Sequence, residues 1–346
     1  MTAIEAPGGR VENQAASGIR PFDITRDLLP VANLIADAFA AELDSRGMAA
    51  LREMRLMGHM GAFLKLFYHA PGDVRNLLHG YVWVEDGRII GNVTLQRADR
   101  HGSRWQIANV AVMPEYRGRG IARRLMERTL EHITDVGARW AVLQVYEANG
   151  PACHLYDAMG FETLGGMTEL RLARVPRLAQ GEPPPTPPAL SDFHPFSARH
   201  EAELYDLANR QLSNQAQWWR PVQRQEFQIP VEERMGEWFW RTLGRRNVLR
   251  RAVYNGRRFD AALELKAQRR SGAHELKLWV RPELYGLYEG PLFDWVLATL
   301  YDYPRLPVTL SLPTDHEAGL AAAQARGFVI ESTLLTMRKQ MGRQIL

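Results

Sequence analysis

The sequence predicts a mixed α/β fold of two tandem domains, each a mixed, mostly antiparallel sheet flanked by helices. Three observations lead to this prediction. The chain has 346 residues, which exceeds an ordinary domain of roughly 150 residues. Five prolines between Pro183 and Pro188 interrupt it near the middle, where neither a helix nor a central strand can run. The order of helices and strands before this segment returns after it.

The proline-rich segment, residues 175–191, is expected to link the two domains. It leaves one domain at 19–174 and a second at 192–346, each near the usual size of a domain. Residues 1–18 are small and polar and lack the apolar stretch of a secretory signal, so we expect a disordered segment there. The chain is therefore expected to fold as two domains joined by one extended segment.

Local patterns predict the elements of the first domain. Apolar residues recur at intervals of three and four over 27–43, which indicates an amphipathic helix. Residues 81–97 alternate in polarity around Asp86-Gly87 and predict a hairpin of two antiparallel strands. The remaining expected elements are a strand over 105–114, a helix over 120–136, a strand over 139–146, a helix over 149–160 and final strands from Phe161.

The second half repeats this order. Its expected elements are a hairpin over 248–270, a strand over 274–282, a helix over 292–300, a strand over 308–313 and a helix over 316–328. The interval from Leu143 to Gly160 equals that from Leu310 to Gly327. The offset between the two halves, from Leu143 to Leu310, is much longer than a solenoid repeat, so it indicates a duplicated domain.

Composition narrows the classes of function. No apolar run approaches the ~20 residues that a membrane helix needs, so no membrane association is expected. A single cysteine, Cys153, forbids an intramolecular disulfide and favours a cytoplasmic protein. Lysine and arginine number 43 against 39 aspartate and glutamate, which is too balanced to predict nucleic-acid binding but favours an anionic ligand. No residue pattern predicts a metal site.

The stretch "PEYRGRGIARRL" lies where a predicted strand gives way to a predicted helix. A helix start leaves backbone N–H groups without partners and is partly positive, so it attracts anions. Gly118 and Gly120 would let the backbone approach a phosphate, while Arg117 and Arg119 supply charge. The loop matches neither a Rossmann nor a Walker pattern. A glycine turn with a solvated basic end is the alternative.

With its context, this loop resembles that of the GNAT N-acetyltransferase family, in which Gln/Arg-x-x-Gly-x-Gly/Ala follows a Val-x-Val-x-Pro strand and opens a helix. Arg117, Gly120 and Ala122 match that pattern. Downstream, the family's other marks are matched by Asn149, Tyr156 and the pair Gly160-Phe161. The resemblance covers roughly residues 19–174.

The resemblance implies acetyl-CoA as the cofactor. Backbone amides would hold the pyrophosphate, the strand before the loop would pair with the pantetheine arm, and this strand would splay from the next one to admit the thioester. The implied cofactor-binding residues are Val110, Ala111, Val112, Arg117, Gly118, Arg119, Gly120, Ile121, Ala122 and Asn149.

Direct acetyl transfer needs a base for the amine and an acid for the departing thiolate. The resemblance implies Tyr156 as the acid, although core packing would also explain this residue. Asn149 is expected to cap a helix, to contact cofactor or substrate, or to do both. Where several relatives carry a glutamate base this chain has Gln144, so Glu147, or a water ordered by Gln144 or Asn109, is the expected proton route.

The second domain lacks these residues. Its corresponding loop, "PELYGLYEGPL", places Glu289 and Pro291 where amides and positive charge are wanted. The tyrosine and the asparagine of the first half correspond to Ala323 and His316. We therefore expect a degenerate copy that does not bind acetyl-CoA.

The sequence thus predicts an acetyl-CoA-dependent N-acetyltransferase that acts on a primary amine of a small molecule or a protein, with the second domain shaping the acceptor site. A catalytically silent acyl-CoA sensor or assembly module is the alternative. A monomer or a homodimer would fit. Residues 41–67 lie where acceptor-binding helices are expected.

Two further patterns have open interpretations. The aromatic clusters Trp218-Trp219 and Trp238–Trp240 suit a core or a substrate wall. Four arginine doublets suit solvated faces or attraction for an acidic substrate or partner. The doublets are Arg245-Arg246, Arg250-Arg251, Arg257-Arg258 and Arg269-Arg270.

Overall fold

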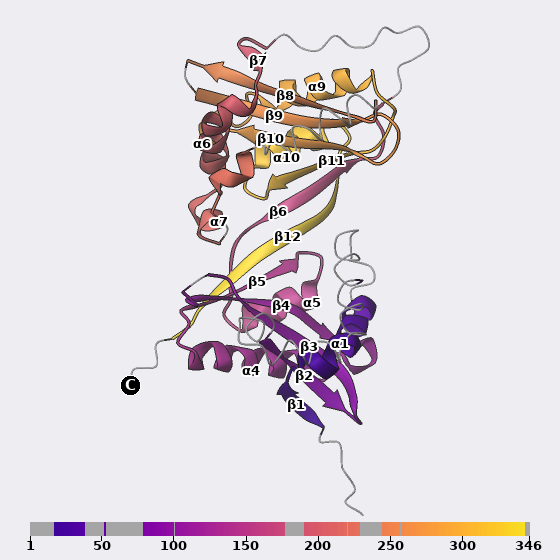
Figure 1. Cartoon of the computed structure of the whole chain (residues 1–346), viewed down its shortest axis with the longest axis vertical. Helices are drawn as coiled ribbons and strands as arrows, with labels where there is room; N and C mark the ends of the chain where they lie inside the picture. Colours follow the sequence, from indigo (N-terminus) through magenta and orange to yellow (C-terminus); the bar gives the residue numbers. More distant parts are fainter. Residues whose placement is uncertain are drawn as a thin grey trace, which may run out of the picture. The chain divides into compact units, whose positions relative to one another are not determined.

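The computed structural model describes residues 17–38, 52, 79–99, 101–176, 190–219, 221–228, 244–256 and 258–342. They belong to two compact units. The first unit draws on residues 1–144, 155–161 and 338–346, and the second on residues 145–154 and 162–337. In Figure 1 the strands β1 to β4 of the first unit are indigo to purple, and the strands β8 to β11 of the second are orange to yellow.

The sheet of the first unit has the strand order β1-β2-β3-β4-β5. Its strands are β1 (Gly18–Pro21), β2 (His79–Glu85), β3 (Arg88–Arg97), β4 (Arg104–Val112) and β5 (Trp140–Tyr146), the last lying in this unit as far as residue 144. Neighbours run antiparallel except β4 and β5, which are parallel. The predicted hairpin is confirmed: Asp86 and Gly87 turn with φ of 48° and 75°, as a tight β2–β3 turn requires.

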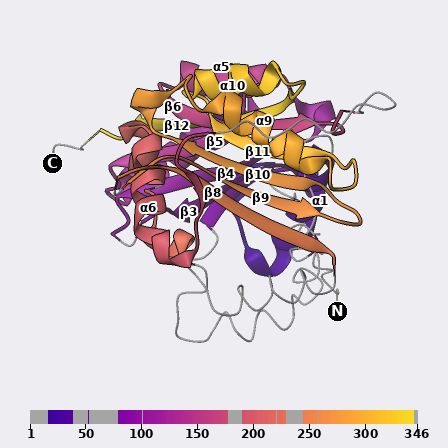
Figure 2. The same ribbon diagram turned by 90° about the horizontal axis from the view of Figure 1, so that it is seen from above.

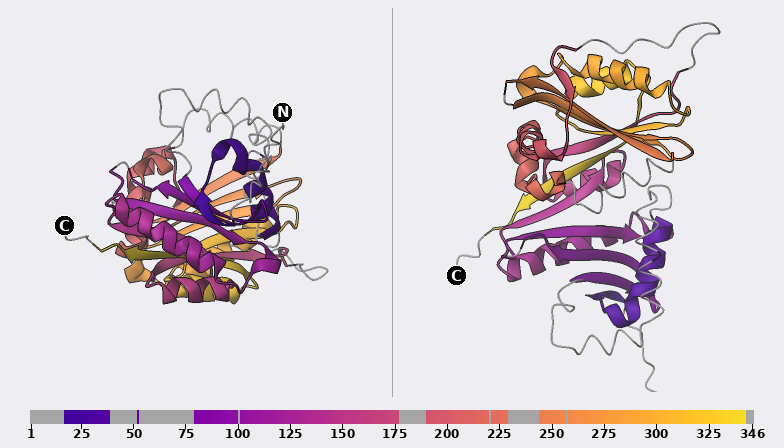
Figure 3. Two further views of the ribbon diagram at one scale, coloured as in Figure 1. Left: turned by 90° about the horizontal axis from the view of Figure 1, so that it is seen from below. Right: turned by 45° about the horizontal axis from the view of Figure 1, so that its top comes forward.

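Helices α1 (Ile24–Ala38) and α4 (Ile121–Asp135) cover opposite faces of this sheet. Side chains of a strand alternate between faces. Val82 and Val84 pack in a cluster with α1, whereas Trp83 lies beneath the guanidinium of Arg124 on α4. The two-sided arrangement can be followed in Figure 3. The predicted helix over 27–43 is confirmed as far as Ala38, and the predicted acceptor region, 41–67, lies outside the described residues apart from Arg52.

The second unit repeats this architecture in the strand order β12-β6-β11-β10-β9-β8-β7. The strands are β6 (Glu162–Leu172), β7 (Phe193–Pro195), β8 (Arg246–Asn255), β9 (Arg258–Gln268), β10 (His274–Val280), β11 (Val308–Pro313) and β12 (Val329–Gln340). As in the first unit, antiparallel neighbours lead to one parallel pair, here β10 and β11. The duplication predicted from spacing is therefore present in the fold.

Helices also cover both faces of the second sheet. They are α6 (Glu201–Gln211), α7 (Asn214–Trp219), α9 (Glu289–Leu300) and α10 (Glu317–Gln324). Ala262 packs in the cluster of α6, whereas its strand neighbours Ala261 and Leu263 pack in the cluster of α9, so the two helices lie on opposite faces (Figure 2). Trp218 and Trp219 on α7 are half-buried, and Trp238–Trp240 lie outside the described residues.

The grouping of strands differs from the linear division into 19–174 and 192–346. Strand β6 pairs with β11, and Leu170, Leu172 and Val175 are buried in the second unit's core. The predicted linker, 175–191, therefore begins inside a packed core, since Val175 is 0% exposed. Conversely, the end of the chain belongs to the first unit, where Met341 N–H donates to Arg139 O at 2.9 Å. Pairing and burial, rather than chain order, decide these memberships.

Residues 1–16 and 177–189, which hold most of the expected disordered segment and of the linker, lie outside the described residues. Gly18 begins β1. None of the described helices is long and apolar enough to cross a bilayer.

Candidate functional site

The loop between β4 and α4 has the backbone that its glycines predict. After a 3₁₀ turn at Pro114–Tyr116, Gly118 and Gly120 adopt φ of 77° and 76°, the left-handed region that favours glycine. A Cβ built on either glycine would meet no atom within 4 Å. The loop therefore presents bare backbone to open space.

The start of α4 gathers backbone hydrogen-bond donors. Gly120 is the N-cap and offers no side chain to cap the helix. Across the described residues, the N–H groups of Gly120, Ile121, Ala122 and Arg123 donate to no acceptor in the protein. Four such groups converge at the positive end of a helix of 15 residues. This geometry suits an anion.

The arginines beside this loop have structural partners. Arg117 turns back toward the sheet, where its Nε donates to Val112 O at 3.1 Å and its Nη2 to Ala38 O at 3.5 Å. Arg119 donates to Glu115 O at 3.2 Å, and its guanidinium lies 4.8 Å from the centre of the Tyr116 ring. Both residues are exposed. Arg117 therefore braces the loop against β4, while both charges stay near the helix start.

Strand β4 separates from β5 just before this loop. Their parallel pairing runs only from Arg104↔Trp140 to Ile107↔Leu143, although β4 continues to Val112. On its other side β4 stays paired with β3, since Met113 N–H donates to Ile90 O at 2.9 Å and Val112 lies opposite Gly91. Successive backbone groups alternate in direction, so those of Val112 point toward the side that β5 has left. Arg117 takes Val112 O, but no strand among the described residues pairs with this edge, which leads to the helix start.

A bulge at Asn109 marks the separation. The β3–β4 register shifts between Asn92 and Thr94, and Asn109 has φ of 52°, one of the few non-glycine residues in the left-handed region. The side chain of Asn92, 1% exposed, donates from Nδ2 to Asn109 O at 3.0 Å and to Thr94 Oγ1 at 3.3 Å. Asn109 Nδ2 lies 3.4 Å from the same Thr94 hydroxyl.

Asn92 and Thr94 were missed by the sequence reasoning, which considered Asn109 only for a proton route. The signal available was the asparagine itself, because asparagine tolerates left-handed backbone better than most residues. A buried asparagine on the neighbouring strand is a second signal, since such a side chain needs hydrogen-bond partners.

The predicted catalytic residues lie on β5 and α5 (Gly150–Ala158). Gln144 is exposed and directly follows the last paired residue of β5, so it lies where the strands part. Tyr156 is 6% exposed, and its ring packs edge-on against Phe161 with centroids 5.9 Å apart. Glu147 is exposed in the turn after β5. Asn149 is confirmed as a cap, because its Oδ1 accepts from Ala152 N–H at 3.3 Å.

The second unit has the same opening, filled by its own side chains. Pairing of β10 with β11 ends at Leu276↔Leu310, although β10 continues to Val280. Gln211 of α6 donates from Nε2 to Leu278 O at 3.4 Å, beyond the end of the pairing. The same amide donates to His316 Nδ1 at 3.3 Å. A side chain from a helix, Gln211 of α6, therefore bonds to the strand edge here, whereas in the first unit the loop residue Arg117 bonds to Val112 O at the end of the edge.

The corresponding loop of the second unit is also closed from within. Glu289 and His316 are 0% exposed, with Oε1 and Nε2 2.8 Å apart. Glu289 Oε2 accepts the loop N–H of Gly286 at 2.8 Å, and the Tyr285 ring stacks on His316 with centroids 3.9 Å apart. Burial opposes ionisation of Glu289, but the hydrogen bonds from His316 and backbone N–H groups outweigh it and lower its pKa.

Comparisons with known proteins agree with this geometry. Residues 45–161 match the model of the acetyltransferase (GNAT) family. A segment of 53 residues is 45% identical to mycothiol acetyltransferase of Thermobifida fusca, covering 15% of this chain and 16% of the relative. A segment of 83 residues is 34% identical to N-alpha-acetyltransferase 30 of Schizosaccharomyces pombe, covering 23% and 55%. The chain thus spans about half or less of these relatives.

Among solved structures, a tandem GNAT protein from the clavulanic acid biosynthesis pathway aligns over 94% of this chain and 98% of its own, with a TM-score of 0.51 and 16% identity. The likeness extends through both units, so the tandem arrangement of the fold is shared. At this identity it concerns the fold alone.

The left-handed backbone at Asn109 predicts a ranking of variants. A β-branched residue there would be strained, so Asn109→Val is expected to lower the free energy of unfolding of the first unit by about 1–2 kcal/mol. Asn109→Gly can still adopt the left-handed conformation without strain, so its free energy of unfolding should fall by less. Urea unfolding with hydrogen exchange at β4 amides measures both. Equal losses would show that the bulge does not depend on this conformation.

The lowered pKa of Glu289 predicts acid sensitivity of the second unit. Its stabilisation is complete above the ordinary glutamate pKa, 4.5, and is lost as the pH falls through the lower value of the folded state. The hydrogen-exchange protection factors of α9 and α10 amides, which correct for the intrinsic pH dependence of exchange, should therefore fall toward about pH 3 in the native protein. Glu289→Gln should be less stable at neutral pH and show a flatter pH dependence. An unchanged profile would contradict the pairing with His316.

Proposed function

We propose that this chain, whose residues 45–161 match the model of the GNAT acetyltransferase family, is an acetyl-CoA-dependent N-acetyltransferase that binds its cofactor at the loop between β4 and α4. One observation carries the proposal: the unpaired edge of β4 leads directly into an uncapped helix start with two left-handed glycines. An elongated ligand with an amide-bearing arm and a phosphate group matches both parts of this path.

The residues present fit that cofactor. Backbone N–H groups from Gly118 to Ala122 would take the pyrophosphate, and bare glycine surface leaves room for it. The Val110–Val112 edge would pair with the amides of the pantetheine arm, since β5 has ended its pairing there. Arg117 would act as a brace for the loop because its guanidinium already engages two carbonyl groups. Asn149, which caps the start of α5, would contact the cofactor arm or the substrate.

Acetyl-CoA supplies the acetyl group as a thioester; the amine nitrogen forms a bond to the acetyl carbon, the C–S bond breaks, the nitrogen loses a proton and the sulfur gains one. Tyr156 is proposed to hold the proton for the sulfur, a role that its buried place on α5 would shield from bulk water. Gln144 cannot accept the amine proton. Glu147, exposed after β5, or water beside Gln144 would carry it to solvent.

The second unit is proposed to bind no acetyl-CoA and to shape the acceptor site. Gln211, Glu289 and His316 occupy the places that a cofactor would need, which supports this division of roles. The acceptor is a primary amine. Matched relatives include an enzyme named for mycothiol and one named for protein N-alpha-acetylation, so a small amine and a protein terminus are both candidates.

Binding is tested by thermal unfolding with acetyl-CoA. At about 100 times its dissociation constant the ligand should stabilise the native protein by about 2.7 kcal/mol. Gly120→Asp places a carboxylate against the pyrophosphate and should abolish the shift. Gly120→Asn is the matched control, because asparagine has the same size and tolerance of left-handed backbone without the charge. If both variants bind acetyl-CoA as the native protein does, the loop is not part of the binding site.

Turnover is tested by the release of free CoA thiol with a panel of small amines and peptide N-termini. Tyr156→Phe should bind acetyl-CoA as the native protein does but release thiol about 10²-fold more slowly, or slower still, because a general acid is lost. Glu147→Gln separates the two proton routes. If thiol release slows by as much as in Tyr156→Phe, Glu147 is the base. Tight binding with no turnover on any amine would instead establish the sensor alternative.

A further inference from the structure

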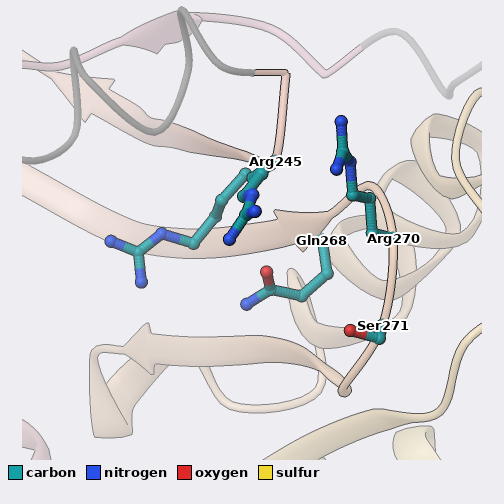
Figure 4. A pocket seen from close by; sticks show the side chains of 5 residues that line it. Arg245, Gln268, Arg270 and Ser271 are labelled. Carbon is teal, nitrogen blue, oxygen red and sulfur yellow. The ribbon is translucent and has the colours of Figure 1, made fainter.

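A cleft in the second unit lies where β8 begins and β9 ends. It is lined by Arg245, Arg246, Gln268, Arg270 and Ser271. Arg246 and Gln268 are direct partners across the two strands, Arg245 directly precedes β8, and the turn after β9 carries Arg270 and Ser271. Figure 4 shows Arg245 and Arg270 on either side of Gln268, with Ser271 on the adjoining turn. Three guanidinium groups thus come from two separate segments of chain.

The backbone that carries this cleft is firmly held. Arg269 N–H donates to Arg245 O at 2.9 Å and extends the β8–β9 ladder past its last pair. Gln268 N–H donates to Nδ1 of His274, which is 0% exposed, and the opposite ring nitrogen lies 3.0 Å from Pro304 O. The guanidinium of Arg269 lies 4.9 Å from the centre of the Tyr303 ring. The lining residues therefore project from a preorganised frame.

Several arginines of this sheet have partners of a kind that Arg246 and Arg270 lack. Arg250 pairs with Glu264 at 2.6 Å, Arg258 pairs with Asp260 at 3.3 Å, and Arg251 lies over the Trp295 ring. Among the residues that the structure describes, no carboxylate lines the cleft. Within the described part of the chain, Arg246 and Arg270 form no ion pair.

Like charges gathered in a cleft repel one another unless an anion joins them. The neighbouring carboxylates do not serve that purpose, since Glu264 is held by Arg250 and lies near two lysines, and Glu275 lies 4.0 Å from Lys266. The positive charge of the cleft is thus left for a ligand.

We propose that this cleft binds the phosphate group of a small molecule. Guanidinium groups have donors only and present them as a planar fork that matches phosphate oxygens. A tetrahedral phosphate offers oxygens in several directions and so can engage arginines on two segments at once. The amide of Gln268 and the hydroxyl of Ser271 add neutral donors. Free phosphate and a phosphate ester share this chemistry.

The experiment measures binding of inorganic pyrophosphate, glycerol 3-phosphate and succinate by calorimetry at fixed ionic strength. The full chain carries Gly120→Asp, so that binding at the proposed acetyl-CoA loop does not contribute. Both phosphates are expected to bind, and succinate, similar in charge to the ester, at least tenfold more weakly. Binding of glycerol 3-phosphate at least as tight as that of the more highly charged pyrophosphate would identify an ester as the ligand, and tighter binding of pyrophosphate would identify an inorganic phosphate anion.

Arg246→Gln and Arg270→Gln should each weaken phosphate binding tenfold or more, whereas Arg199→Gln, on an exposed residue away from the cleft, removes the same charge and should change it less than twofold. Arg246→Lys keeps the charge but loses the fork and should also weaken binding. Circular dichroism confirms that each variant is folded. Equal weakening by Arg199→Gln, full binding by Arg246→Lys, or succinate binding as tight as phosphate would overturn the proposal.

Discussion

The candidate site depends on one backbone constraint, the left-handed conformation of Asn109 in β4. The extra residue of the bulge shifts the register against β3, and the parallel pairing with β5 has ended by this point. The buried Asn92 amide takes the displaced Asn109 carbonyl, so the irregularity leaves no orphaned group there. The bulge therefore lies where β4 continues toward α4 beyond its pairing with β5.

Each unit has a place where two strands part, and the two units differ in how the backbone groups there are hydrogen-bonded. Where two strands part inside a fold, backbone donors and acceptors lose their partners, and burying them unpaired is costly. The second unit meets this need internally, with Gln211 on the strand edge and Glu289 on the loop N–H of Gly286. The first unit leaves its helix start uncapped. The difference in chemistry between the copies therefore lies in a few side chains placed on a common backbone plan.

Arginine has three different uses in this molecule. Arg117 is a brace that joins a loop to the end of β4, and Arg250 neutralises a carboxylate across two strands. Arg246 and Arg270 do neither and meet at a cleft. The arginine doublets of the sequence do not by themselves distinguish Arg250 from Arg246 and Arg270. An arginine's role follows from the acceptors that neighbouring strands bring to it.

Several features followed from short-range rules and were predictable from the sequence. Asp86-Gly87 specifies a tight turn, the spacing of Ile121, Leu125 and Ile133 specifies the buried face of α4, and Gly118 and Gly120 specify a loop that L side chains would strain. The repeated order of elements predicted the duplication. Each rule concerns residues within a turn or two of one another, which is why sequence alone was enough.

The features that required the structure involve partners distant in the chain. Leu170 and Leu172 alternate as any half-buried strand does, and only pairing with β11 assigns them to the second core. The capping role of Asn149 was open to local reasoning, whereas the bulge at Asn109 depends on Asn92 in a neighbouring strand. The sequence by itself determined which elements form, in what order, and where the glycine loop before α4 lies. Tertiary structure alone decided which strands part and which openings are filled, because these depend on long-range pairing and burial.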